Sequence, residues 1–291
     1  MTLQSSASAV APAEALETGR REIPKRRPVK NSWGRLPVWL RRGLLLVGLI
    51  GLWKAYIEFK HVNPLLVSDP WVVAKELYHG WASGDLVDPT LTTMKVLATG
   101  MTIGILLATF FVVFASWTKV GDDLLTLLTA MLNPLPAIAV LPLAMLWFGL
   151  NTNALLFVIA NAVTWPIAIN VAMGFKTVNP AIVSVGRNIG LSRLRLVLEV
   201  LAPAALPYAI TGIKTAWAFG WRTLIAAELV FGVAGDKGGL GFYINDARLY
   251  LDTPKIFVGL VTIAVIGIAF DLIFTLLERR TVIRWGMKAN V

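Results

Sequence analysis

The chain has 291 residues, of which 56% are hydrophobic and 15% charged, and its formal net charge is +10. Soluble domains carry roughly a quarter charged residues, and mean hydropathy is high at +0.69. The apolar residues come in blocks too long for a soluble core, so the sequence predicts an integral membrane protein with several helical spans. The absence of cysteine excludes disulfides, thiolate metal sites and cysteine catalysis.

The basic residues lie beside the ends of the apolar blocks rather than over one face, which argues against nucleic-acid binding and is typical of cytoplasmic loops. The two histidines, His61 and His79, are isolated in polar surroundings, so no metal site is expected. Residues 1–35 combine an Ala/Ser-rich stretch with the proline-broken basic run "GRREIPKRRPVK". This composition predicts a disordered basic cytoplasmic tail, followed by a membrane domain over residues 36–291.

Six apolar stretches approach the ~20 residues that a helix needs to cross about 30 Å of hydrocarbon. The third stretch carries Pro134, Pro136 and Pro142, which free backbone groups at membrane depth, so this span is predicted to be broken or kinked. The predicted spans are 39–58, 95–116, 123–148, 154–174, 204–231 and 255–277.

Apolar residues also recur at helical spacing after Pro70, between the first two spans, and predict an amphipathic helix at the membrane surface. In the second span Gly100 and Gly104 form a G-x-x-x-G spacing, which allows close helix packing. Lysine and arginine are concentrated in residues 1–42, around 119, over 176–195 and after 279. The positive-inside rule therefore predicts that both termini are cytoplasmic.

The stretch "NIGLSRLRLVLEVLAPAALP" lies on the same predicted cytoplasmic side. We expect a short helix over Ile182–Ile189, a break at Gly190 and a second helix over Leu191–Leu201. Pro203 and Pro207 would then begin the fifth span, because proline is tolerated in the first turn of a helix. Such a basic and apolar helix-turn-helix is suited to docking on a partner, and a loop that packs on its own bundle is the alternative.

This stretch resembles the "EAA loop" of permease subunits of binding-protein-dependent ABC importers, whose pattern is E-A-A-x3-G-x9-I-x-L-P. The chain has Ser184-Val185-Gly186, then Gly190, then Val200-Leu201-Ala202-Pro203, so the spacing from glycine to proline matches. Ser184 stands at the usual glutamate, Val185 and Gly186 at the alanines, and Ala202 at the leucine.

Four further blocks are similar to the nitrate/sulfonate/taurine/bicarbonate subfamily of these permeases, and the resemblance covers roughly residues 60–285. The blocks are "NPLPAIAVLPLAMLWFGLNTNA", "LAPAALPYAITGIKTAWAFGWRTLIAAEL", "GGLGFYINDAR" and "LERRTVIRW".

The resemblance implies an all-α fold: a polytopic membrane bundle of about six transmembrane helices with a cytoplasmic EAA coupling loop, the type I ABC importer permease fold. The chain would sit in the bacterial inner membrane among lipids and form the translocation path for a small anion, with a second permease copy in a homodimer. Cytoplasmic ATP-binding subunits would bind and hydrolyse ATP, so the chain itself would be no enzyme and hold no cofactor. A periplasmic or lipid-anchored binding protein would deliver a nitrate-, sulfonate/taurine- or bicarbonate-like substrate. The residues expected to couple to the ATPase are Ser184, Gly186, Arg187, Gly190, Leu191, Ser192, Arg193 and Pro203.

Charged residues in a span are costly and usually face a protein interior or a wet cavity. One face of the fifth span carries residues at steps of three or four, namely Lys214, Trp217, Trp221, Leu224 and Glu228. Arg222 and Glu228 are deep, and either pair structurally between helices or, in the case of Arg222, attract an anion. Asn133, beside the prolines of the third span, is a further candidate for a cavity lining. The candidate substrate pathway is Asn133, Trp217, Trp221, Arg222 and Glu228.

The glycine-rich "GDKGGLG" at Gly235–Gly241 has no G-K-[ST] and no preceding strand, so we interpret it as a turn; the resemblance places it near the outer gate. The alternative function is a stand-alone ion-driven secondary transporter or a membrane enzyme. A carrier needs ionisable groups at mid-membrane, and here only Arg222, Glu228 and Asp271 qualify. An enzyme needs a convergent nucleophile, acid and base, for which neither histidine is placed.

Overall fold

The computed structural model describes residues 36–231, 238–278 and 280, and in these residues every regular element is a helix. The predicted tail over residues 1–35 and most of the terminal "LERRTVIRW" block lie outside the described residues. The chain divides into two units, Met1–Leu52 and Trp53–Val291. Helix α1 (Val38–Lys60) coincides with the first predicted span and buries none of its residues.

Four helices of the described part are long and apolar enough to cross a membrane, and a bent pair makes a fifth span if its halves count together. Helix α1 is not among them because every 18-residue stretch of it contains at least three charged residues. The four are α3 (Val87–Trp117), α6 (Thr152–Lys176), α9 (Ala202–Phe231, with the helical turns before it) and α11 (Thr253–Glu278).

The predicted break in the third span is confirmed. Helix α4 (Lys119–Leu132) ends at Asn133, and the chain turns by 93° into the 3-10 helix η3 (Ala137–Val140) and α5 (Leu141–Phe148). Pro134 and Pro136 occupy the turn, where they cannot donate the backbone hydrogen bonds that would continue α4.

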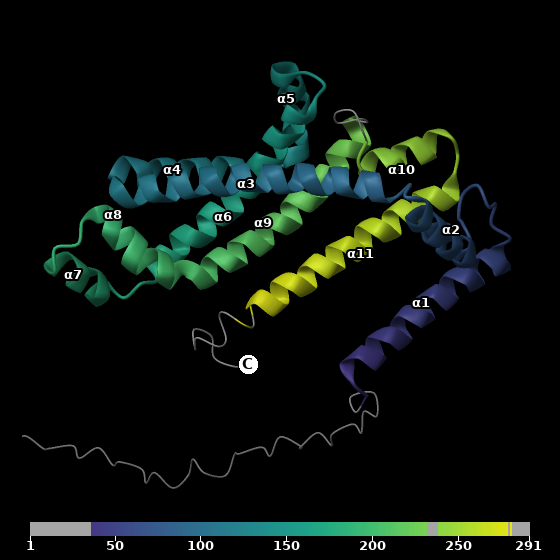
Figure 1. Ribbon diagram of the computed structural model, residues 1–291, viewed down its shortest axis with the longest axis horizontal. Coiled ribbons are helices and arrows are strands. Elements are labelled where there is room, and N and C mark those ends of the chain that lie inside the picture. The colour runs from purple at the N-terminus through teal and green to yellow at the C-terminus, as the bar shows by residue number, and fades with distance from the viewer. Residues whose placement is uncertain (1–35, 232–237, 279, 281–291) are drawn as a thin grey trace, which may run out of the picture. The chain divides into compact units, whose positions relative to one another are not determined.

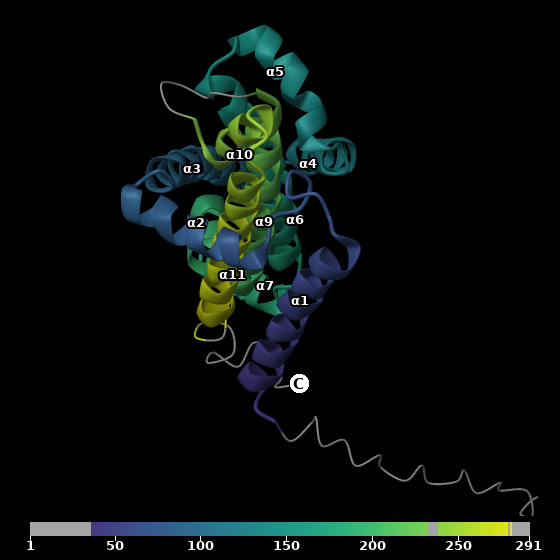
Figure 2. The ribbon, with the colours of Figure 1, turned by 90° about the vertical axis from the view of Figure 1, so that its right-hand side faces the viewer.

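Helix α6 is the centre of the helix bundle and packs along both α3 and α9 (Figure 1; Figure 2). Its residues Leu155, Ile159 and Val163 are fully buried, together with Leu97 of α3 and Leu224 of α9. Between membrane helices such contacts are favoured by close van der Waals packing rather than by release of water. The bundle therefore depends on how closely the backbones approach.

The G-x-x-x-G spacing of α3 provides this close approach, as predicted. A Cβ atom at Gly100 would lie 2.6 Å from Cγ2 of Ile159, and one at Gly104 would lie 2.7 Å from Cγ1 of Val163. Both side chains belong to α6 and are rigid β-branched residues. The two glycines thus set the separation of α3 and α6.

We expect Gly104→Ala to destabilise the protein by about 1–2 kcal/mol, because overpacking against Val163 outweighs the better helix propensity of alanine. Gly48→Ala in α1 is the matched control, since a Cβ there meets nothing within 4 Å. Its expected effect is a small gain of at most about 1 kcal/mol. Thermal unfolding in detergent compares the two variants, and equal midpoints would contradict the packing argument.

Short helices lie at both ends of the bundle, with α7 and α8 at one end and α2 and α10 at the other (Figure 1). Helix α10 (Leu240–Leu249) contacts α3, α9 and α11 at one end, and α2 (Pro70–Ser83) packs against α11 there. The predicted helix after Pro70 is thus present, capped by Asp69, with Val73 buried against Val258. Helix α7 (Pro180–Asn188) and α8 (Arg193–Leu196) form the other end, next to Trp117 at the end of α3.

Candidate functional site

The first half of the predicted coupling loop is α7, which begins where its sequence predicts a helix start. Asn179 caps the helix, its side-chain oxygen accepting a hydrogen bond from the backbone N–H of Ala181 at 2.9 Å, and Pro180 occupies the first turn. Ser184, at the position of the family's glutamate, is exposed and donates its hydroxyl back to the carbonyl of Pro180 at 2.9 Å. Ser184 therefore forms a hydrogen bond within its own helix and, unlike a glutamate, adds no charge to this surface.

The predicted break at Gly190 is confirmed, and the reason is conformational. Gly190 has φ +84°, a left-handed backbone that residues with a side chain rarely adopt, while a Cβ there would meet nothing within 4 Å. Gly186 differs: a Cβ there would lie 2.7 Å from Cδ1 of Leu196. Gly190 therefore turns the chain, and Gly186 allows α7 and α8 to pack closely.

The second half of the loop is helical from Arg193, two residues later than predicted, because Ser192 caps it and accepts a hydrogen bond from Arg195 N–H at 3.4 Å. A π-helical turn (η4, Val197–Leu201) follows and leads directly into α9. The prediction that Pro203 and Pro207 begin a new span needs correction, since Pro207 lies inside α9 and the helical run is continuous from Arg193 to Val230.

The π turn has a physical cause in Pro203. Proline has no N–H to donate to the carbonyl four residues earlier, and its ring clashes with that carbonyl. The chain widens the turn instead, with the N–H of Ala202 bonded to the carbonyl of Val197, five residues earlier. Such π turns are frequent at functional sites.

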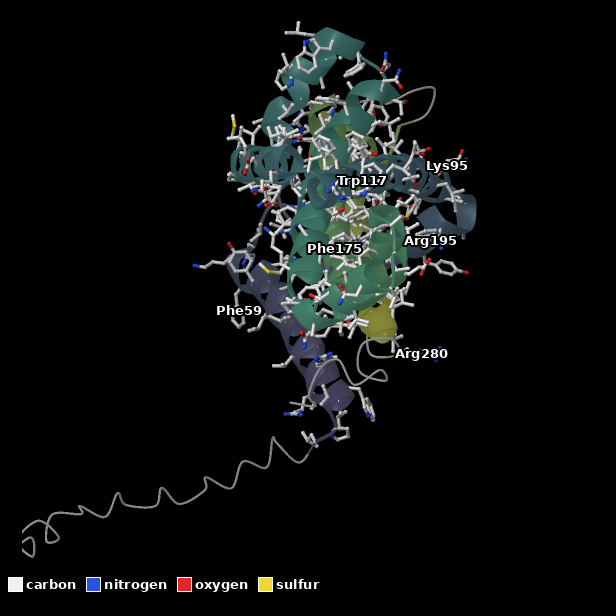
Figure 3. The ribbon with its side chains drawn as sticks, turned by 90° about the vertical axis from the view of Figure 1, so that its left-hand side faces the viewer. Phe59, Lys95, Trp117, Phe175, Arg195 and Arg280 are labelled. Atoms are coloured by element: carbon white, nitrogen blue, oxygen red, sulfur yellow. The ribbon has the colours of Figure 1, made fainter. Side chains whose placement is uncertain are left out.

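The loop is tied to the bundle by Arg193, whose Nη1 donates to the carbonyl oxygen of Trp117 at 2.9 Å. Trp117 and Phe175, labelled in Figure 3, come from the ends of α3 and α6 and line a groove of about 920 Å³. Arg187 and Leu191 line the same groove from the loop. Three of the predicted coupling residues, Arg187, Leu191 and Arg193, thus line a groove between the loop and the bundle.

One face of α7 is apolar and uncovered. Ile182, Val185 and Ile189 are 55%, 59% and 71% exposed, and they follow one another at steps of three and four residues. Leu194 and Leu198 of the second half are also exposed, at 47% and 60%. Apolar side chains gathered in this way mark an interaction surface.

Among the pathway candidates, Glu228 is fully buried and joins three helices. Its carboxylate accepts hydrogen bonds from the Thr93 hydroxyl of α3 at 3.0 Å and from the Gly241 N–H at 2.9 Å. The same hydroxyl accepts the N–H of Leu240 at 2.8 Å. Glu228 and Thr93 together cap the amino terminus of α10, where a carboxylate is favoured.

This cap explains the glycines of "GGLG". A Cβ at Gly239 would overlap the carboxylate of Glu228, and one at Gly241 would lie 2.5 Å from its Cβ. The glycines therefore leave room for a buried side chain of α9. Residues 235–237 of the predicted turn lie outside the described residues.

Trp217 and Trp221 are buried between α9 and α11. The ring of Trp217 stacks on Phe270 with centroids 3.8 Å apart and on Trp221 at 5.9 Å. Near one end of this contact, Lys214 pairs with Asp271 at 3.2 Å and donates to the hydroxyl of Thr275 at 3.1 Å. Trp217 thus holds α11 to the bundle, and the predicted part of both tryptophans in the pathway remains a prediction.

Arg222 is exposed, and within the described ranges it does not pair with Glu228, so the interpretation of these two residues as an ion pair is wrong. Its Nε donates to the Ala218 carbonyl at 2.9 Å, and its guanidinium lies 5.3 Å from the centroid of the Phe219 ring. The charge is therefore held beside the helix and is accessible.

Asn133 is exposed at the turn that breaks the third span, and it lines a cavity of about 130 Å³ as predicted for a lining residue. The opposite wall includes Asn161 of α6 and Thr223 of α9, which the sequence reasoning did not single out. The available signal was an amide in the middle of an apolar span, because polar side chains there are rare and usually functional.

Comparison with known families decides the class of this protein. Residues 100–283 match the family described as "Binding-protein-dependent transport system inner membrane component". The chain belongs to this family. It is therefore a multi-pass inner-membrane permease of an ABC importer.

Curated relatives match the permease over most of both chains. The taurine transport system permease protein TauC of Escherichia coli (strain K12) is 30% identical over 84% of this chain and 88% of its own. SsuC of the same organism, a permease protein named for aliphatic sulfonates transport, is 29% identical over 89% and 95%. The riboflavin transport system permease protein RibX of Chloroflexus aurantiacus is 30% identical over 85% and 91%.

A solved structure supports the fold. The chain described as an amino acid ABC transporter with histidines superimposes with a TM-score of 0.56 at 18% identity, and covers 70% of this permease and 97% of itself. The similarity confirms the predicted all-helical permease fold.

Proposed function

We propose that this permease imports a small organic anion of the sulfonate or taurine type, driven by ATP hydrolysis in separate subunits. The support is the similarity to TauC and SsuC along nearly the whole of each chain. RibX is as similar in identity, so the fold alone does not select the substrate. The accessible guanidinium of Arg222 fits an anionic cargo.

In this proposal the permease contacts its ATP-binding subunit through the apolar face of α7, which consists of Ile182, Val185 and Ile189, and through the bend at Gly190. We infer that a cytoplasmic ATP-binding subunit covers this apolar face, since it is the exposed apolar stripe on the part of the chain similar to the EAA loop. ATP itself would be bound by that subunit, and this chain would hold no cofactor. The motion of the partner would bias a bistable bundle between inward-open and outward-open states.

The rest of the assembly follows from this placement. With α7 and α8 inside the cell, α9 and α11 would cross outward and back and return the C-terminus to the cytoplasm. The N-terminus would be cytoplasmic as well with α1 as a further crossing, which is the orientation that the distribution of lysine and arginine predicts. The opposite end, with α10 and the Glu228 cap, would then face the periplasm, where a soluble or lipid-anchored binding protein releases its cargo. A second copy of this chain would complete the path as a homodimer within the lipid bilayer.

The test is uptake by proteoliposomes that contain the permease, its ATP-binding subunit and external binding protein. We expect accumulation of radiolabelled taurine or methanesulfonate only when ATP is enclosed with the ATPase subunit. Vesicles with a non-hydrolysable ATP analogue are the control. Equal uptake without ATP would contradict the proposal and favour the stand-alone carrier.

A further inference from the structure

The cavity at the broken span opens at the side of the bundle, since Asn133, Pro134 and Phe219 of its lining are exposed. It is bounded by the turn after α4, by Asn161 and Trp165 of α6, and by Phe219 and Thr223 of α9. Asn161 is far from both ends of α6, which runs from Thr152 to Lys176. The cavity is therefore placed near mid-membrane depth, where irregular backbone is tolerated only if it is buried in protein or lines a wet cavity.

Asn161 has an unused hydrogen-bond donor at this cavity. Its Nδ2 is buried and has no hydrogen-bond partner. Its Oδ1 accepts the indole N–H of Trp165 at 3.0 Å. Because indole N–H can only donate, this contact fixes which end of the amide is oxygen, so the group left at Nδ2 is a donor.

An unpaired donor in a buried site is costly, and native structures retain such groups where a ligand or water completes them. The cavity volume of about 130 Å³ is several times the ~30 Å³ of one water molecule. It is smaller than the roughly 300–1,000 Å³ of pockets that enclose whole drug-sized ligands. The space thus fits the head group of a small solute.

The charges around the cavity favour an anion. Among the described residues that line it, none is acidic, and Asn133 and Thr223 add further polar groups. Arg222 supplies a positive charge 5.3 Å from the ring of Phe219, which itself forms part of the wall. A donor amide in the cavity, with a guanidinium beside one residue of its wall, is suited to an oxyanion.

We propose that this cavity is an oxyanion subsite of the translocation path, in which Nδ2 of Asn161 donates a hydrogen bond to an oxygen of the sulfonate head group. The proposal rests on the proposed function and adds a specific contact to it. Trp165 acts as a positioning residue, since its indole N–H bonds to Oδ1 and so leaves Nδ2 as the end of the amide that can donate to a ligand.

The direct test measures binding to the permease–ATPase complex in nanodiscs, without the binding protein. We expect methanesulfonate to raise the unfolding temperature of the complex in a dose-dependent manner, and dimethyl sulfone, its uncharged analogue, not to do so. Asn161→Asp places a carboxylate against the anion and should abolish the shift. Asn161→Ala removes the donor alone and should weaken the apparent affinity about 10- to 100-fold.

Asn170→Asp is the matched control because Asn170 lies on the same helix, outside the cavity lining, with its Nδ2 bonded to the carbonyl of Pro166 at 2.7 Å. This variant should bind methanesulfonate like the unmodified complex. An unchanged affinity in Asn161→Ala would overturn the subsite and indicate that only water occupies the cavity. If Asn161→Asp fails to assemble, Asn161→Ala alone decides.

The two proposals fail in different ways. If methanesulfonate stabilises the complex through Asn161 but no sulfonate is transported, the subsite stands and the proposed substrate is wrong. If ATP-driven sulfonate uptake occurs and Asn161→Ala leaves its KM unchanged, the proposed function stands and the subsite is wrong.

Discussion

Gly190→Pro is expected to abolish ATP-dependent uptake while the permease still folds and still binds its ATPase subunit. Gly190 has φ +84°, whereas proline holds φ near −65°. Proline also removes the N–H that Gly190 donates to the Arg187 carbonyl at 3.0 Å. The bend between α7 and α8 must therefore change direction. Nothing lies within 4 Å of a Cβ at this position, so the bundle itself is spared.

The measurement is the number of substrate molecules imported per ATP hydrolysed, with co-purification of the ATPase subunit as the test of assembly. Gly190→Ala and Gly84→Ala form a matched pair, since Gly84 has φ +93° and is equally uncrowded but lies beside α2. Each alanine should cost about 1–2 kcal/mol of backbone strain. Only the change at Gly190 should lower the transport ratio. A normal ratio in Gly190→Pro would refute the coupling role.

Glu228→Ala is expected to destabilise the permease by about 2–4 kcal/mol, because hydrogen bonds to a charged group contribute more than neutral ones and their removal leaves buried partners unsatisfied. The lost partners are the Thr93 hydroxyl and the N–H of Gly241. The first turn of α10 should open, and hydrogen exchange at Leu240 and Gly241 is the measurement that reports it.

Glu228→Gln separates the size of the side chain from its accepting capacity. Glutamine keeps the volume but presents one acceptor oxygen where the carboxylate presents two, so the expected loss is about half that of alanine. Glu199→Ala is the surface control, since Glu199 is half exposed and its contact with Arg195 is long at 3.9 Å. Unchanged exchange in α10 of Glu228→Ala would show that the cap does not hold this helix.

The sequence was sufficient for the spans because they depend on local composition. Apolar blocks of membrane length and the prolines at 134 and 136 predicted α3, α6, α9, α11 and the broken span. The shape of the predicted coupling segment could also be derived from the sequence, because a cap, a glycine and a proline each act over only a few residues. The first predicted span corresponds to α1, which carries more charged side chains within the helix than the other four.

Contacts between distant parts of the chain could not be predicted from local sequence patterns. Thr93 and Glu228 are 135 residues apart, and neither residue indicates the other. The expectation that Glu228 would pair with Arg222 followed from opposite charges alone and overlooked that the two side chains point to different surroundings, one buried and one exposed. The unpaired N–H of Asn161 becomes a candidate ligand contact only because of the cavity, and the sequence alone does not reveal that cavity.

The helical run from Arg193 to Val230 has a mechanical consequence. It is 38 residues long, or roughly 57 Å at 1.5 Å per residue. A rigid rod of this length that is tilted by about 5° moves its far tip by about 5 Å. Displacement at the nucleotide-driven end would then reach the cap of α10 through one lever, without a relay of separate contacts. Such a rod would bend first at two places, the π turn at Val197–Leu201 and the proline at position 207.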